Sequence, residues 1–221
     1  MNDILLKLDK IRERDKDVKI AGSVLASILI LVFGIVIGAI ALTIQHFAAN
    51  STVWWQDIFK DVAVDQIFKH FPVWFMFGLG VAINSSRPIK AAINDFMFFI
   101  GVIAGYNLVP MILKDVAKPD NMGTWFLIAI VSIPLAMIFW YAKSQSWPSI
   151  AFDAVILGVL GAICFDCGFL YFHFSDADMI MDLYNAIIVA LVAVLLASGV
   201  VQFVVSLAVG VLIALLLGPV L

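Results

Sequence analysis

The chain has 221 residues, of which 64% are hydrophobic and 13% charged, and its 13 Lys and Arg against 16 Asp and Glu give a net charge of -3. A soluble domain is roughly 45–50% apolar and about 25% charged. The composition therefore excludes a soluble enzyme and a nucleic-acid-binding protein, and two cysteines are too few for a disulfide framework. It predicts an all-α integral membrane protein that contacts the lipid bilayer, because helices satisfy their own backbone hydrogen bonds in lipid.

The first twenty residues are mostly charged, and the first long apolar stretch begins at Ala21. Residues 2–17 hold five acidic and five basic side chains around apolar residues at helical spacing, among them Ile4 and Leu8. This pattern predicts a cytoplasmic amphipathic N-terminal helix over 1–20, lying on the inner surface or against a partner. A solvated charged segment is the alternative. The stretch from Ala21 is too long for a signal peptide, so we expect it to stay in the mature protein.

The apolar stretches predict about seven spans within one transmembrane domain over 21–221, built as one helix followed by three helical hairpins. A helix needs roughly 20 residues to cross a bilayer of about 30 Å. The predicted spans lie near residues 21–45, 68–84, 95–113, 123–142, 150–172, 181–197 and 200–219. The last two form one apolar stretch divided at Ser198-Gly199, which we interpret as a tight turn. A re-entrant hairpin or a single tilted helix are the alternatives.

Residues 52–66, between the first two spans, predict an outer interfacial helix. Trp54, Trp55 and Ile58 share one helical face, whereas Asp57 and Asp61 recur on another. Tryptophan is enriched at the membrane–water interface. The expected role of this helix is therefore anchoring.

The distribution of basic residues predicts the orientation, because basic loops stay in the cytoplasm. Nine Lys and Arg fall on one side of the predicted spans and four on the other. We therefore expect a multi-pass protein of the cell membrane with a cytoplasmic N-terminus and an external C-terminus. The nine are Lys7, Lys10, Arg12, Arg14, Lys16, Lys19, Arg87, Lys90 and Lys143, and the four are Lys60, Lys69, Lys114 and Lys118.

Two predicted cytoplasmic turns repeat one pattern. Pro88 is followed by Asp95 and a glycine-rich stretch, and Pro148 by Asp153 and a second such stretch. We interpret the two carboxylates as caps at the start of their helices. Small residues about one turn apart let helices approach closely in lipid, which predicts that the first, third and fifth spans form the tight centre. The glycines concerned are Gly34, Gly38, Gly101, Gly105, Gly158 and Gly161.

This hairpin pattern resembles a family of uncharacterised bacterial multi-span membrane proteins. The resemblance covers roughly residues 70–170 and rests on Ser85, Pro88, Gly101, Gly105 and Tyr106. It implies a multi-span helical fold and supplies no function.

One carboxylate falls well inside a predicted span. Counted from Ile150, Asp166 lies about 24 Å along its helix, and an ionisable group in hydrocarbon is by default a functional candidate. We expect it to face the bundle interior, where Asn107, Gln45 or His46 can hydrogen-bond it. These four side chains are the candidate substrate or ion site.

The same side of the bilayer collects thiol and imidazole groups from Cys164, Cys167, His173 and His70. Such side chains are ligands of Zn, Cu or Ni, and the Cys-x-x-Cys spacing predicts both sulfurs on one helical face. A transition-metal site is therefore a hypothesis, and simple packing of the small cysteines is its alternative. No other cofactor is expected.

Three functional classes remain open. We favour a small-solute or ion transporter, or the substrate-capturing subunit of an uptake system, because duplicated hairpins are common in transporters. A non-catalytic accessory or assembly protein, bound to a membrane protein partner or to a second copy of itself, is the alternative. A membrane thiol oxidoreductase is less favoured, since the chain holds only one cysteine pair. We expect no enzymatic activity.

The topology can be tested with reporter fusions at residues 50, 86, 118, 146 and 178. The predicted spans place these positions alternately outside, inside, outside, inside and outside. A cytoplasmic signal at residue 118 would overturn this register.

Overall fold

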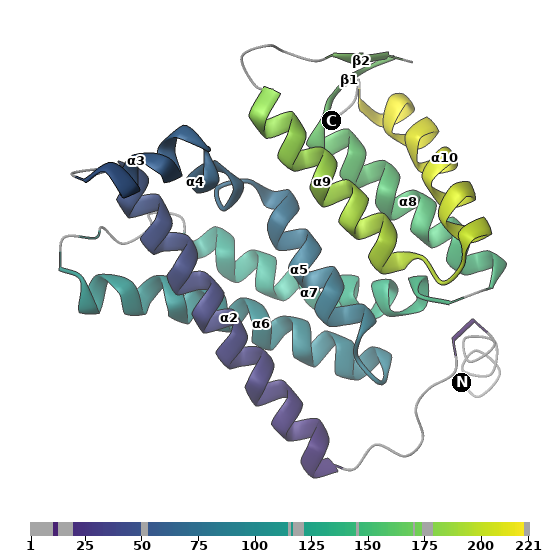
Figure 1. The fold of residues 1–221 in the computed structure, drawn as a ribbon. Helices are drawn as coiled ribbons and strands as arrows, with labels where there is room; N and C mark the ends of the chain where they lie inside the picture. The colour runs from purple at the N-terminus through teal and green to yellow at the C-terminus, as the bar shows by residue number, and fades with distance from the viewer. Residues whose placement is uncertain are drawn as a thin grey trace.

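The structure is a computed structural model that describes residues 11–12, 20–49, 53–114, 116, 122–144, 146–169, 171–173 and 179–218. Helices dominate the described chain, and one short hairpin of two strands lies between α8 and α9 (Figure 1). The elements are α2 (Ile20–Ala49), α3 (Trp54–Asp61), α4 (Val64–Ile67), α5 (Phe71–Ile83), α6 (Pro88–Ile112), α7 (Met122–Ala142), α8 (Trp147–Cys164), β1 (Asp166–Gly168), β2 (Tyr171–His173), α9 (Met179–Leu196) and α10 (Val200–Leu217).

The predicted all-α membrane fold is confirmed. Six of the described helices are long and apolar enough to cross a membrane, namely α2, α6, α7, α8, α9 and α10. The predicted span 68–84 is α5, whose 13 residues extend only about 20 Å, less than a hydrocarbon layer of about 30 Å. It begins at Phe71 because Pro72 suits the first helical turn and His70 before it is extended.

The helices form two groups that meet along α5. Figure 1 shows α8, α9 and α10 side by side, with α2, α5, α6 and α7 gathered in the other group. The most extensive contacts join α2 to α6 and α8 to α10, while α5 contacts α6, α7 and α9. The apolar core holds one cluster around Trp74 and Phe98 and another around Leu160 and Trp140. The second cluster joins the two helix groups, because it contains residues of α5, α6 and α7 together with residues of α8 and α9.

Glycines line the contact between α2 and α6. A Cβ atom added at Gly34 would overlap the carbonyl oxygen of Phe98, and one added at Gly101 would overlap that of Leu31. Gly38 and Gly105 face the opposite backbone in the same way, so only glycine lets these two helices come this close.

A second glycine contact lies elsewhere in the bundle, between α8 and α10. A Cβ atom at Gly158 would collide with the Ile213 side chain, and one at Gly161 would lie 3.2 Å from the Cβ of Ala214. The prediction that the first, third and fifth spans share one centre is therefore wrong. The fifth span, α8, takes α10 as its close partner because Gly210 and Ala214 offer it a matching small-residue surface.

The predicted span 150–172 is wrong at its outer end. Helix α8 ends at Cys164, because Phe165 is extended, with φ -122° and ψ 145°. The chain then turns through the β1–β2 hairpin, in which Cys167 pairs with Phe172. Asn185 of α9 donates to the Cys164 carbonyl oxygen at 2.6 Å, which satisfies one of the backbone acceptors exposed at a helix end.

The predicted interfacial helix 52–66 is two short helices, α3 and α4. Ala63 between them adopts a left-handed conformation with φ 52°, which interrupts the helix. Trp54 of α3 is 76% exposed, in keeping with an anchoring surface, and Tyr184 of α9 donates to the Val62 carbonyl oxygen at 2.7 Å.

Most of the predicted N-terminal helix 1–20 lies outside the described residues, but Arg12 is placed. Its guanidinium donates to the carbonyl oxygens of Trp140 at 2.6 Å and Ile83 at 2.9 Å, and lies 4.4 Å from the Trp140 ring centroid. These carbonyls end α7 and α5, where a cation is favoured by the helix dipole. Burial lowers the pKa of Arg12 from its ordinary value. Arg12 thereby links the C-terminal ends of α5 and α7.

The close contact between α2 and α6 predicts that the stability of the protein depends strongly on Gly101. Gly101→Ala should destabilise the protein by about 1–3 kcal/mol, because the added methyl group forces two backbones apart. Gly80→Ala is the matched control, since a Cβ atom there meets nothing within 4 Å and alanine favours the helix. Thermal unfolding in detergent measures both variants. Equal melting temperatures would contradict the account.

Candidate functional site

Two members of the predicted outer site, Gln45 and Asn107, make contacts within the helix bundle. Gln45 of α2 hydrogen-bonds Tyr106 of α6, and Asn107 donates to the Ile103 carbonyl oxygen at 2.8 Å and to the sulfur of Met122 at 3.8 Å. These two side chains serve the contacts among α2, α6 and α7.

His46 and Asp166 are the other two members of that prediction. His46 of α2 is half-buried and lies beside the Phe47 ring, 6.0 Å between centroids. The backbone of Asp166 lies in β1 and not in a helix. The prediction that Asp166 faces the bundle interior assumed that the helix of span 150–172 continues to this residue, and it does not. The side chain of Asp166 lies outside the described structure.

The structure also bears on the hypothesis of a transition-metal site formed by cysteine and histidine side chains. Cys164 and Cys167 are both free and buried, but Cys167 lies beyond the end of α8, so the two sulfurs do not share a helical face. The Cys167 thiol is 4.0 Å from the Gly161 carbonyl oxygen. His70 is exposed before α5, and the side chain of His173 lies outside the described structure. Among the described residues, no group of three or more His, Cys, Asp or Glu is placed to hold a metal ion.

A buried carboxyl group that we interpreted as a cap forms the best candidate site. Asp95 is the eighth residue of α6, about 10 Å along the helix from Pro88, and only 2% of it is exposed. The residue before this helix, Arg87, makes no side-chain cap hydrogen bond. The cap interpretation is therefore wrong, because Asp95 lies two turns inside the helix.

The surroundings of Asp95 come from α5 and α7. One carboxyl oxygen, Oδ1, has no hydrogen-bond partner among the described residues, and a Cβ atom added at Gly78 would lie 3.0 Å from it. Ser132 of α7 forms a side-chain hydrogen bond with Asp95. The Ser132 hydroxyl also lies 2.9 Å from the Ala129 carbonyl oxygen, so it can donate its one proton to either acceptor.

The Asp95 carboxyl group borders a cavity of about 180 Å³ between α5, α6 and α7. Apart from Asp95 and Ser132, the described lining is apolar, and four phenyl rings contribute to it. The rings belong to Phe71, Phe75, Phe99 and Phe139. Phe75 and Phe139 touch edge to face at 5.2 Å between centroids. A single carboxyl group thus borders a space whose described walls, apart from Ser132, are aromatic and aliphatic.

Asp153 of α8 is the counterpart of Asp95 in the repeat, and it is fully buried. Gln202 of α10 donates to Asp153 Oδ2 at 2.5 Å and to the Ser149 hydroxyl at 3.4 Å. Within the described part of the chain, the remaining oxygens, Asp153 Oδ1 and Gln202 Oε1, have no hydrogen-bond partner. Both are acceptors when the carboxyl group is ionised, so one proton supplies the donor that this pair lacks. Asp153 is therefore a paired structural group, whereas Asp95 borders open space.

No family model, no curated protein and no solved structure matches the chain. Function is therefore inferred from the positions and chemistry of the side chains. Among the buried carboxyl groups of the described structure, Asp65 is paired with Lys69 at 2.7 Å and Asp153 with Gln202, whereas Asp95 borders the cavity.

The Asp153–Gln202 pair predicts a measurable coupling. Asp153→Leu or Gln202→Met alone should each destabilise the protein by about 1–3 kcal/mol, because each leaves a buried polar partner unsatisfied. The destabilisation of the double variant should be smaller than the sum of the two single-variant destabilisations, by about 0.5–3 kcal/mol. Asp153→Asn, which keeps a donor and an acceptor, is the control. Additive effects in thermal unfolding would show that the pair does not act as a unit.

Proposed function

We propose that the chain is a transporter of a small organic cation, with Asp95 as the group that binds the cation. The observation that carries the proposal is the unpaired oxygen of a nearly fully buried carboxyl group at the wall of an apolar cavity. Ionisable groups within membrane helices are rare and costly, and they mark substrate pathways and proton relays.

The lining of the cavity supports an organic cation over an inorganic one. A metal cation needs several oxygen ligands, whereas the described lining offers the Asp95 carboxyl group and the Ser132 hydroxyl. Phenyl rings attract alkylammonium ions through the faces of their π systems, and four rings border this space. A carboxylate with aromatic walls suits an ammonium group that carries small apolar substituents.

Charge balance supports exchange of the cation for a proton. A bare carboxylate in apolar surroundings is strongly unfavourable. Asp95 is neutral when it holds a proton, and the site is also neutral when the carboxylate holds a cation. Each state can be reached from the other by exchange of one cation for one proton, so no isolated charge is left in the membrane.

Proteoliposomes with a pH-sensitive dye inside test this proposal. External tetramethylammonium serves as the probe, because it has no neutral form that crosses lipid unaided. The proposal predicts that its entry drives protons out and raises the internal pH. Asp95→Asn should reduce the signal to that of protein-free liposomes, and Asp153→Asn, which alters the buried carboxyl group of α8, should retain it.

A labelling experiment tests the role of Asp95 without measuring transport. Dicyclohexylcarbodiimide attacks protonated carboxyl groups in apolar surroundings, so it should modify Asp95 in preference to the paired Asp153. Tetramethylammonium should slow the modification, as measured by mass spectrometry of peptides. An inert Asp95, or no tetramethylammonium signal from the unaltered protein, would count against the proposal and favour an accessory role.

A further inference from the structure

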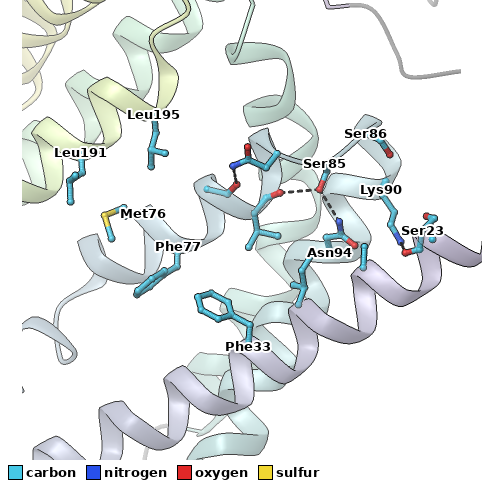
Figure 2. Close-up of a pocket in the computed structure, with 16 residues that line it drawn as sticks. Ser23, Phe33, Met76, Phe77, Ser85, Ser86, Lys90, Asn94, Leu191 and Leu195 are labelled. Carbon is cyan, nitrogen blue, oxygen red and sulfur yellow. Dashed lines mark hydrogen bonds between the residues drawn. The ribbon is translucent and has the colours of Figure 1, made fainter. Parts of the chain in front are cut away.

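A second and larger pocket, of about 760 Å³, lies on another face of α5 (Figure 2). It is bordered by α2, α5 and α6 on one side and by Leu191 and Leu195 of α9 on the other. The Asp95 cavity uses Phe75, Gly78 and Leu79 of α5, whereas this pocket uses Met76, Phe77, Gly80 and Val81. The two spaces are therefore separate.

One end of this pocket is polar and positively charged. Lys90 is the one charged side chain among the sixteen described residues that line it. Its ammonium group donates to the Ser23 carbonyl oxygen and the Ser27 hydroxyl, both neutral, and Ser86 lies at the same end (Figure 2). An ammonium group has three donors, so one N–H remains for an anion, and the described lining offers no acid to neutralise it.

Hydrogen bonds fix this polar end. Ser27 donates to Asn94 Oδ1 at 2.7 Å, Asn94 donates to the Ser85 hydroxyl at 2.9 Å, and Ser85 donates to the Val81 carbonyl oxygen at 2.9 Å. The network links α2, α6 and α5 behind Lys90. The ammonium group is thus held in place before any ligand arrives.

The other end of the pocket is apolar, with Phe33, Phe77, Met76, Leu191 and Ile30 along its walls. From Ser23 near the start of α2 to Phe33 the helix rises about 15 Å. That is about half of a hydrocarbon layer of about 30 Å. The pocket therefore runs from a charged end at the helix termini to an apolar end near the middle of the membrane, within one leaflet.

We propose that this pocket binds one anionic phospholipid of the leaflet at the Lys90 end, with its phosphate on Lys90 and an acyl chain between Phe33 and Leu191. The chemistry of the two ends matches the two ends of such a lipid. Because α9 and α2 stand on opposite walls, the bound lipid fills the space between the two helix groups. It stabilises their arrangement without taking part at Asp95.

Native mass spectrometry of the purified full-length protein tests the proposal by titration with phosphatidylglycerol and with phosphatidylcholine. One phosphatidylglycerol should be retained in preference to phosphatidylcholine. Lys90→Gln should weaken phosphatidylglycerol binding about tenfold, the effect of losing one charge-assisted hydrogen bond. It should weaken phosphatidylcholine binding less, because the choline cation of that lipid already balances its phosphate, so the preference for phosphatidylglycerol should fall. Lys60→Gln, which removes an exposed lysine of α3, is the matched control and should bind as the unaltered protein does.

A second variant tests the apolar end without touching the charge. Gly80 lines the pocket, and a Cβ atom there meets nothing within 4 Å, so Gly80→Leu should fold and occupy the space of the acyl chain. It should lose the bound lipid while Lys90 is intact. Equal retention of both lipids by the unaltered protein, or unchanged retention by both variants, would overturn the proposal. Stabilisation by inorganic phosphate equal to that by phosphatidylglycerol would show an anion site and not a lipid site.

Discussion

The cost of an isolated charge among apolar helices governs the surroundings of Asp95 and Asp153, the buried carboxyl groups that the described structure places within α6 and α8. A carboxylate without a partner in such a place is strongly unfavourable, so the group must hold a proton, a hydrogen-bond partner or a cation. Asp153 meets this requirement with Gln202, whose amide approaches to 2.5 Å. Asp95 has Ser132 on one side and a cavity on the other. The same residue type at corresponding places in a repeated hairpin is thus structural in one helix and available for binding in the other.

Glycine contacts determine where these carboxyl groups are enclosed. The close approach of α2 and α6 leaves the opposite side of α6 to α5 and α7, and Asp95 lies on that side next to Gly78. The equally close approach of α8 and α10 places Gln202 directly opposite Asp153. Between the two groups of helices, where no such glycine contact forms in the described structure, the large pocket at Lys90 remains. The positions of the glycines therefore determine both which helices pack closely and where the Lys90 pocket remains open.

The sequence predicted the features that depend on local composition. Span positions followed from apolar length, although α6 and α8 begin at Pro88 and Trp147, before the predicted starts at residues 95 and 150. It did not predict the end of α8 at Cys164, because that end depends on Asn185 of another helix and on strand pairing within the next nine residues.

The candidate site was missed for a related reason. Asp95 was interpreted as a cap, although counting seven residues from Pro88 already places it two turns inside its helix. That count was available from the sequence. The cavity was not, because it depends on which faces of α5 and α7 meet α6, and the positions of Gly78 and Ser132 carry no sign of that contact in the sequence.

The account depends most directly on the protonation of Asp95, which infrared difference spectroscopy measures through the carbonyl stretch of a protonated carboxyl group. Spectra of the purified protein with and without tetramethylammonium should show the loss of one such band on binding, and Asp95→Asn should lack that difference. The band of Asp153 should persist in both. A spectrum in which tetramethylammonium changes no carboxyl band, or changes the same band in Asp95→Asn, would contradict the account.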